Sequence, residues 1–137
     1  MIRVLIVDDH QFFRQCLAAV INSSTGLEAV GECRDGDEVV DAVQELNPHV
    51  VLMDVRMGTA SGIDAVAALR RNHPHLPVIM LTSETAAATR AAARANGASG
   101  YLLKGCPTDL VGRAIHHVAA GLSAWSEEFE AALGVGA

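Results

Sequence analysis

Residues 1–10 read MIRVLIVDDH, an apolar run that ends on two adjacent aspartates. From Ile2 to Val7 every residue except Arg3 is aliphatic, and this pattern is typical of a strand buried on both faces of a parallel sheet. Similar runs occur at residues 50–53, 78–81 and 101–103, and a weaker one with interspersed acids and a glycine at 27–33. We therefore expect five strands, with the weaker one at an edge of the sheet.

Segments with helical periodicity separate these strands. Their apolar stripes are Phe13, Cys16, Leu17, Val20 and Ile21, then Val39, Val43 and Leu46, then Ile63, Val66 and Leu69. A fourth helix is expected from Glu84 to Asn96, where alanines give high helix propensity but little grip on the core, and a fifth from Thr108 to Ala120. This alternation of strand and helix predicts a doubly wound α/β fold with a five-stranded parallel sheet.

The composition indicates one compact domain, because half of the 137 residues are hydrophobic and 19% are charged. The net charge of -6 argues against direct binding of nucleic acid. Cys16, Cys33 and Cys106 form neither an even set nor a CxxC motif, which favours reduced thiols in a cytoplasmic protein. No apolar run approaches the roughly 18 residues of a membrane span, so no membrane partner is expected.

Polar residues follow the predicted strands, where the carboxyl ends of parallel strands meet at one edge of the sheet. They are Asp8 and Asp9, then Asp54, then Thr82 and Ser83, then Lys104. Crowded carboxylates repel one another unless a cation joins them, and Mg2+ prefers oxygen ligands of this kind. Asp54 could then act as a nucleophile toward phosphorus, with the metal, Thr82 and Lys104 taking up charge on the phosphoryl oxygens.

Two of these features have ordinary alternatives. Asp8 and Asp9 could merely cap the first helix, although Asp54 and Lys104 at the same edge favour a metal site. Lys104 could be a chance surface lysine, but it is the one lysine in a chain whose nine other basic residues are arginine, which indicates a requirement for a compact point charge. His10 follows the acidic pair, and a solvent-facing side chain is narrowly favoured there over contact with bound metal or phosphate.

At these residues the chain resembles the receiver domain of two-component response regulators, over about residues 1–122. The resemblance implies a flavodoxin-like fold with strand order 2-1-3-4-5. It also implies site roles: phosphoacceptor Asp54; Mg2+ ligands Asp8, Asp9, Asp54 and the backbone carbonyl of Arg56; and a switch pair, Thr82 and Tyr101.

Three stretches resemble the NarL/LuxR-type subfamily, namely DDHQFFR at 8–14, GASGYLLKG at 97–105 and AIHHVAAG at 114–121. In that subfamily the receiver normally precedes a helix-turn-helix domain. No basic recognition helix is found before Ala137, so we expect DNA contact only through a domain absent from this chain. Residues 123–137, SAWSEEFEAALGVGA, are expected to form a short helix and a linker, with Ser126 as its cap and Trp125, Phe129 and Leu133 along one side.

The resemblance implies a phosphorylation-operated switch rather than an enzyme, although the domain is expected to assist its own phosphorylation and dephosphorylation. Its partner would be a sensor histidine kinase. Phosphorylation would alter the surface of the fourth helix, fifth strand and fifth helix, and would favour a homodimer through that face. We expect the fourth helix to shift because its alanines hold it only weakly to the core.

Other functions are weaker interpretations. An aspartyl-phosphate hydrolase would usually have a second aspartate where this chain has Arg56, and a flavodoxin-like cofactor binder would need a phosphate-binding loop where Asp8 and Asp9 repel phosphate. A receiver-like interaction module that takes no phosphate remains open, because Gly58 stands where the family usually has proline. Losing that proline is expected to make the loop beside the acceptor more mobile.

Overall fold

A computed structural model describes residues 1–58, 60–125 and 129 of the chain. Its main sheet has five strands, all paired in parallel, in the order β2-β1-β3-β6-β7. The strands are β1 (Ile2–Val7), β2 (Leu27–Cys33), β3 (Val50–Met53), β6 (Val78–Thr82) and β7 (Gly100–Leu103). This is the predicted 2-1-3-4-5 order, and the weak strand at residues 27–33 lies at an edge as expected.

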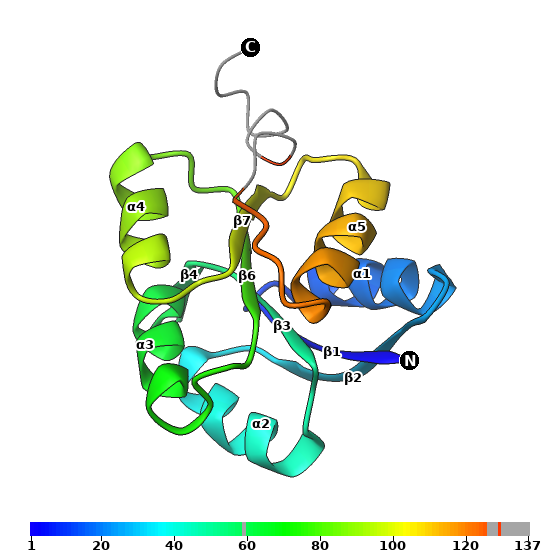
Figure 1. Ribbon diagram of the computed structural model, residues 1–137, viewed down its shortest axis with the longest axis horizontal. Coiled ribbons are helices and arrows are strands. Elements are labelled where there is room, and N and C mark those ends of the chain that lie inside the picture. Colours follow the sequence, from blue (N-terminus) through cyan, green and yellow to red (C-terminus); the bar gives the residue numbers. More distant parts are fainter. Residues whose placement is uncertain (59, 126–128, 130–137) are drawn as a thin grey trace.

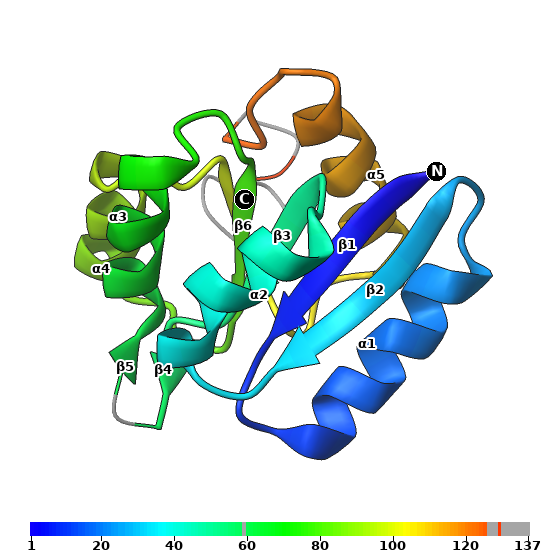
Figure 2. The ribbon, with the colours of Figure 1, turned by 90° about the horizontal axis from the view of Figure 1, so that it is seen from below.

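Five α-helices of the described part connect these strands and cover both faces of the sheet. They are α1 (Gln11–Ser23), α2 (Val39–Leu46), α3 (Gly62–Asn72), α4 (Ala87–Ala95) and α5 (Thr108–Ala119), with a short 3-10 helix η1 (Gly36–Glu38) before α2. Helices α1 and α5 lie on one face, and α2, α3 and α4 lie on the other (Figures 1 and 2). The doubly wound arrangement is therefore confirmed.

The core consists of two apolar layers, one on each face of the sheet. In β1, Val4 and Ile6 pack toward α1 and α5, whereas Leu5 and Val7 pack toward the opposite helices. Successive side chains of a strand point to opposite faces, so a strand covered on both sides must be apolar throughout. Each such side chain, when fully buried, contributes about 1.5–3 kcal/mol to the free energy of unfolding. The predicted stripe of α1 is less complete, because Cys16 is exposed.

Helix α4 begins at Ala87, three residues later than the predicted start at Glu84. The carboxylate of Glu84 accepts a hydrogen bond from the Ala86 amide at 3.1 Å and another from the Arg56 side chain at 2.9 Å. Helix propensity alone favoured including Glu84 in the helix, but these contacts hold it in the preceding loop.

The segment after β3 forms a small antiparallel hairpin, which the sequence did not predict. It consists of β4 (Arg56–Met57) and β5 (Ala60–Ser61) and is visible beside α3 in Figure 2. Gly58 lies in the turn with a φ of 39°, in the left-handed region that favours glycine. Its amide donates to Asp9 Oδ2 at 3.4 Å. The residue found in place of the usual proline therefore has a defined conformation and a partner.

The three cysteines are free thiols, as the sequence predicted. Burial raises the pKa of Cys33 to about 11 and also raises the pKa of Cys106, so neither is a ready nucleophile at neutral pH. Within the described ranges, no helix has both the length and the apolar character that crossing a membrane requires.

Candidate functional site

The strand ends bring Asp8, Asp54 and Lys104 together at the carboxyl edge of the sheet. Each backbone is tied to the neighbouring strand. The amide of Asp8 donates to a carbonyl of β2 at 2.9 Å, that of Asp54 to a carbonyl of β1 at 3.0 Å, and that of Lys104 to a carbonyl of β6 at 2.9 Å. Because the ladder of hydrogen bonds continues through these residues, the sheet fixes where their side chains begin.

The ammonium of Lys104 lies between two buried carboxylates. Its Nζ is 2.7 Å from Asp8 Oδ2 and 2.9 Å from Asp54 Oδ2, and the two aspartates are only 2% and 5% exposed. Burial lowers the pKa of Lys104, but its contacts with the carboxylates of Asp8 and Asp54 outweigh burial, so the pKa is raised. The Phe13 ring, 4.5 Å from Nζ, adds a cation-π contact that the sequence reasoning missed.

Asp8, Asp9, His10 and Asp54 form the one group in the described residues that could hold a metal ion, with ligand atoms within 4.8 Å of one another. Asp8 Oδ2 is buried and has no well-aligned hydrogen-bond donor, although Lys104 approaches it. A cluster of carboxylate oxygens with such an unsatisfied atom fits Mg2+, which prefers hard oxygen ligands. The three aspartates predicted to bind the metal are thus close together.

His10 contacts the acidic pair while remaining largely in solvent. Its Nδ1 lies 3.2 Å from Asp8 Oδ1 and 3.1 Å from Asp9 Oδ1, and 69% of its side chain is exposed. The narrowly favoured interpretation of His10 as solvent-facing therefore captures its exposure but not these contacts.

The side chain of Arg56 pairs with Glu84 in the loop before α4. Its guanidinium pairs with Glu84 Oε2 at 2.8 Å and is 79% exposed, so only the backbone of Arg56 remains as a candidate metal ligand. The Ala86 amide and then the Arg56 side chain donate to Glu84, and these hydrogen bonds lower the pKa of that carboxyl. Sequence reasoning missed Glu84 as a partner of Arg56.

Thr82 and Tyr101, the predicted switch pair, are joined through the backbone of Glu84. The Thr82 hydroxyl accepts from the Glu84 amide at 3.2 Å, and the Tyr101 hydroxyl donates to the Glu84 carbonyl at 2.7 Å. Both residues are 2% exposed, so the Tyr101 ring lies inside the protein. Burial, followed by the nearby charges of Glu84 and Asp54, raises the pKa of Tyr101 to about 12.

Gly62 allows the chain to turn closely around the acceptor residue. A Cβ on Gly62 would overlap the backbone oxygen of Asp54, while the Gly62 amide donates to the Val55 carbonyl at 2.7 Å. The Val55 amide in turn donates to Asp54 Oδ1 at 2.7 Å. One oxygen of the Asp54 carboxylate is thus held by the backbone, and the other by Lys104.

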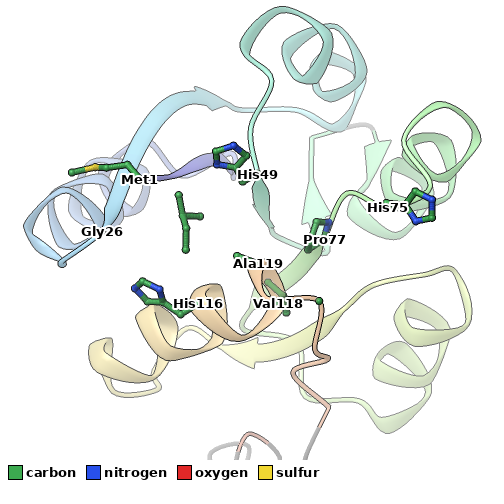
Figure 3. Close-up of a pocket in the computed structure, with 10 residues that line it drawn as sticks. Met1, Gly26, His49, His75, Pro77, His116, Val118 and Ala119 are labelled. Atoms are coloured by element: carbon green, nitrogen blue, oxygen red, sulfur yellow. The ribbon is translucent and has the colours of Figure 1, made fainter.

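A separate hollow lies at the amino ends of the strands, lined in part by Met1, His49, His75 and His116. Figure 3 shows His75 apart from the other two histidines. His49 Nδ1 accepts from the Arg3 amide at 3.0 Å, and His116 Nε2 lies 3.2 Å from the Thr25 carbonyl. The rings of His49 and His116 thus make local backbone contacts, and the candidate metal ligands lie at the opposite edge of the sheet.

Residues 4–116 match the model of the response regulator receiver domain family. The chain belongs to this family. Receiver domains bind Mg2+ at an acidic pocket, are phosphorylated by sensor histidine kinases and are generally non-enzymatic, so membership implies a phosphorylation-operated switch. The acidic cluster described above lies where such a pocket is expected.

Similar proteins support this assignment. The response regulator GacA of Pseudomonas protegens is 40% identical over 123 residues, which cover 88% of this chain and 57% of that protein. The receiver domain of the response regulator NarL from Mycobacterium tuberculosis has a TM-score of 0.82 at 30% identity, over 88% of this chain and 97% of that one. A LuxR-family regulator from an Aurantimonas species has a TM-score of 0.88 at 27% identity, covering 96% and 94%. The receiver thus resembles those of the NarL and LuxR type, and the chain spans a little over half the length of GacA.

Proposed function

We propose that Asp54 of this receiver accepts a phosphoryl group from a sensor histidine kinase and that Thr82, Lys104 and Tyr101 convert this event into a change of surface. The observation that carries the proposal is the position of the Lys104 ammonium, within 2.9 Å of carboxylate oxygens from both Asp8 and Asp54. An ammonium shared in this way pairs with both carboxylates and can move with the phosphoryl oxygens.

In the reaction, an oxygen of Asp54 attacks phosphorus of the kinase phosphohistidine. The O–P bond forms as the P–N bond breaks, and the bonding electron pair leaves with the imidazole nitrogen. Lys104 and the Thr82 hydroxyl supply positive charge and a hydrogen-bond donor to the phosphoryl oxygens, where negative charge gathers. The Asp54 backbone, hydrogen-bonded to β1, holds the nucleophile in place.

Asp8, Asp9, Asp54 and the backbone carbonyl of Arg56 would hold Mg2+ for this step. When bound, the ion neutralises charge on the carboxylates and the transferring phosphoryl group. The contact between the Gly58 amide and Asp9 Oδ2 orients one of these carboxylates from the hairpin side. The oxygen ligands thus come from the residues that follow β1, from the residue that follows β3 and from the backbone of β4.

The acyl phosphate adds about one negative charge beyond that of the carboxylate, with oxygens that can recruit Thr82 and Lys104. The Thr82 hydroxyl accepts a hydrogen bond from the Glu84 amide. A shift of this hydroxyl would therefore displace the loop that leads into α4. The affected surface is that of α4, β7 and α5, through which we expect a homodimer to form. An output in transcription would pass through a helix-turn-helix domain, of the kind the NarL/LuxR-type resemblance implies.

Incubation with acetyl phosphate and Mg2+, followed by intact mass measurement, tests phosphoryl acceptance. The wild-type protein is expected to gain the mass of one phosphoryl group, and Asp54→Asn is expected to gain none. Asp64→Asn is the matched control, because it removes an exposed carboxylate from the first turn of α3 and should leave the gain intact. Chelation of divalent ions should abolish the gain.

The absence of any mass gain in wild-type protein would instead favour a receiver-like module that acts through protein contacts alone. Dimerisation is tested separately by light scattering with and without beryllofluoride and Mg2+. An unchanged molar mass in protein that does accept the phosphoryl group would reject the dimer but not the acceptor.

A further inference from the structure

Residues 123–125, here called the strap, extend the sheet beyond β7. Ala124 forms an isolated parallel bridge with Gly100, and its amide donates to the Ser99 carbonyl at 2.7 Å. The indole Nε1 of Trp125 donates to the Ala98 carbonyl at 2.9 Å. Figure 1 shows the chain leaving α5 and running alongside β7. The strap therefore lies on the α4, β7 and α5 surface that the proposed function assigns to signalling.

The approach of the strap to β7 requires a glycine on the strand. A Cβ on Gly100 would lie 2.5 Å from the Cβ of Ala124 and 3.2 Å from its carbonyl oxygen. Ala124 is 1% exposed, so its methyl group is enclosed at this contact. The close contact between Ala124 and Gly100 therefore indicates specific packing of the strap against β7.

Trp125 packs on the predicted switch residue. Its ring and that of Tyr101 are stacked, with centroids 6.4 Å apart and planes at 27°. The guanidinium of Arg94, on α4, lies 5.2 Å from the centre of the indole. Stacking and cation-π contacts of these kinds stabilise a packed ring beyond the area that it buries. Trp125 thus connects α4, the inward Tyr101 and the strap.

A series of contacts leads from the strap to Thr82, the predicted switch threonine. Trp125 touches Tyr101, whose hydroxyl donates to the Glu84 carbonyl, and the Glu84 amide donates to Thr82. If the Thr82 hydroxyl moves toward a phosphoryl group, the loop at Glu84 and the hydrogen bond of Tyr101 change with it. The position of Tyr101 therefore depends both on the candidate site and on the strap.

We infer that the strap is a clamp that holds Tyr101 inward through Trp125, and that phosphorylation of Asp54 tightens it. This inference rests on the proposed function. Docking of the strap and binding of a phosphoryl group both favour the inward position of Tyr101. Each should therefore strengthen the other by the same factor, because binding couplings are reciprocal. The clamp also covers the edge of β7. A partner that binds the α4, β7 and α5 surface would therefore contact Trp125.

Trp125 is the one tryptophan in the chain, so its fluorescence reports on the strap in the intact protein. Adding beryllofluoride and Mg2+ is expected to reduce quenching of Trp125 by acrylamide in the wild type. Asp54→Asn should show no such change. Unchanged or increased quenching in wild-type protein that acetyl phosphate does label would overturn the clamp and leave phosphoryl acceptance standing. If labelling also fails, both proposals fall.

Two variants test the reverse direction of the coupling. Trp125→Ala removes the stacking partner, and Gly100→Ala blocks the contact with Ala124 while keeping every candidate site residue. In both variants the beryllofluoride concentration needed for half saturation should rise by about fivefold or more. Fluorine NMR measures this saturation. The control Gly112→Ala, on α5, should not. Equal half saturation in all four proteins would reject the coupling.

A readout without phosphorylation completes the test. Trp125→Ala uncovers the Tyr101 ring, so the pKa of Tyr101 should fall toward that of an exposed tyrosine. This shift requires only that Trp125 packs on Tyr101, and its absence would remove the structural basis of the clamp even if the fluorescence responded.

Discussion

Lys104 Nζ lies 2.9 Å from Asp54 Oδ2, although fifty positions separate the two residues in the chain. Asp8 shares the same ammonium at 2.7 Å. One positive charge is therefore shared by two carboxylates, and this arrangement depends on strands β1, β3 and β7 ending at one edge of the sheet. Removing that charge leaves the carboxylates with the desolvation cost but without their partner.

The substitution Lys104→Met is expected to lower the free energy of unfolding by about 3 kcal/mol in the absence of divalent ions. Mg2+ should then stabilise the variant more than it stabilises the wild type, because it supplies the missing positive charge to Asp8 and Asp54. Urea unfolding followed by circular dichroism, with and without Mg2+, measures both effects.

The matched control for Lys104→Met is Arg71→Met, which removes a positive charge from an exposed position in the last turn of α3. It should change stability by less than about 0.5 kcal/mol. Similar losses in the two variants would show that net charge, rather than the ion pair at the strand ends, determines stability.

The ionisation of Tyr101 should be coupled to unfolding at high pH. Burial raises its pKa from 10 to about 12, so the stability it contributes is fully present below pH 10 and is lost as the pH rises through 12. Tyr101 is the one tyrosine in the chain, so tyrosinate absorbance reports on it alone. In folded protein the titration should have its midpoint well above that of protein unfolded in urea. Coincident midpoints would contradict an enclosed ring.

The strand positions could be predicted closely from the sequence because burial on both faces demands continuous apolar runs. The run at Val50–Met53 is buried throughout, and the predicted bounds coincide with those of β3. The grouping of Asp8, Asp54 and Lys104 then follows from parallel strands ending at one edge. Their roles as phosphoacceptor, metal ligands and charge partner stay predictions.

Contacts between loops could not be predicted in the same way. Glu84 reads as a helix former, but its pairing with Arg56 and its own backbone keep it before α4. The hairpin at residues 56–61 has strands of two residues, too short for a periodic signal. The stacking of the Trp125 ring on Tyr101 is a further contact that the sequence did not predict. Most of the predicted C-terminal helix, residues 126–128 and 130–137, lies outside the described residues.

Gly62 and Gly112 offer opposite predictions for the same substitution. Gly62→Ala should lower the free energy of unfolding by about 3 kcal/mol, because the added Cβ meets the backbone oxygen of Asp54. Gly112→Ala should raise it by about 0.5–1 kcal/mol, since Gly112 lies inside α5 and its nearest neighbour, a methyl carbon of Leu27, would be 4.0 Å away. Urea unfolding of both variants measures the difference. A mild effect of Gly62→Ala would mean that the hairpin can move away from Asp54.

Restoring the residue that the family usually has after Met57 should harm this protein. Proline fixes φ near -65°, whereas Gly58 has a φ of 39°, and proline has no amide to donate to Asp9 Oδ2. A Cβ at this position would also lie 2.8 Å from Asp35 Oδ2. We therefore expect Gly58→Pro to lower the free energy of unfolding by about 1–3 kcal/mol.

Gly58→Pro should also weaken Mg2+ binding, because Asp9 loses the contact that orients it toward Asp8 and Asp54. Calorimetric titration with Mg2+ measures this affinity. Gly105→Pro is unsuitable as a control because its neighbour Lys104 lies in the site, so Gly58→Ala, which keeps the amide, is the matched variant. If Gly58→Ala loses stability but retains Mg2+ affinity, backbone conformation and the hydrogen bond to Asp9 have separate effects. A Gly58→Pro variant that is more stable than the wild type, with unchanged Mg2+ affinity, would show that the turn readily adopts the proline geometry and that the contact with Asp9 is dispensable.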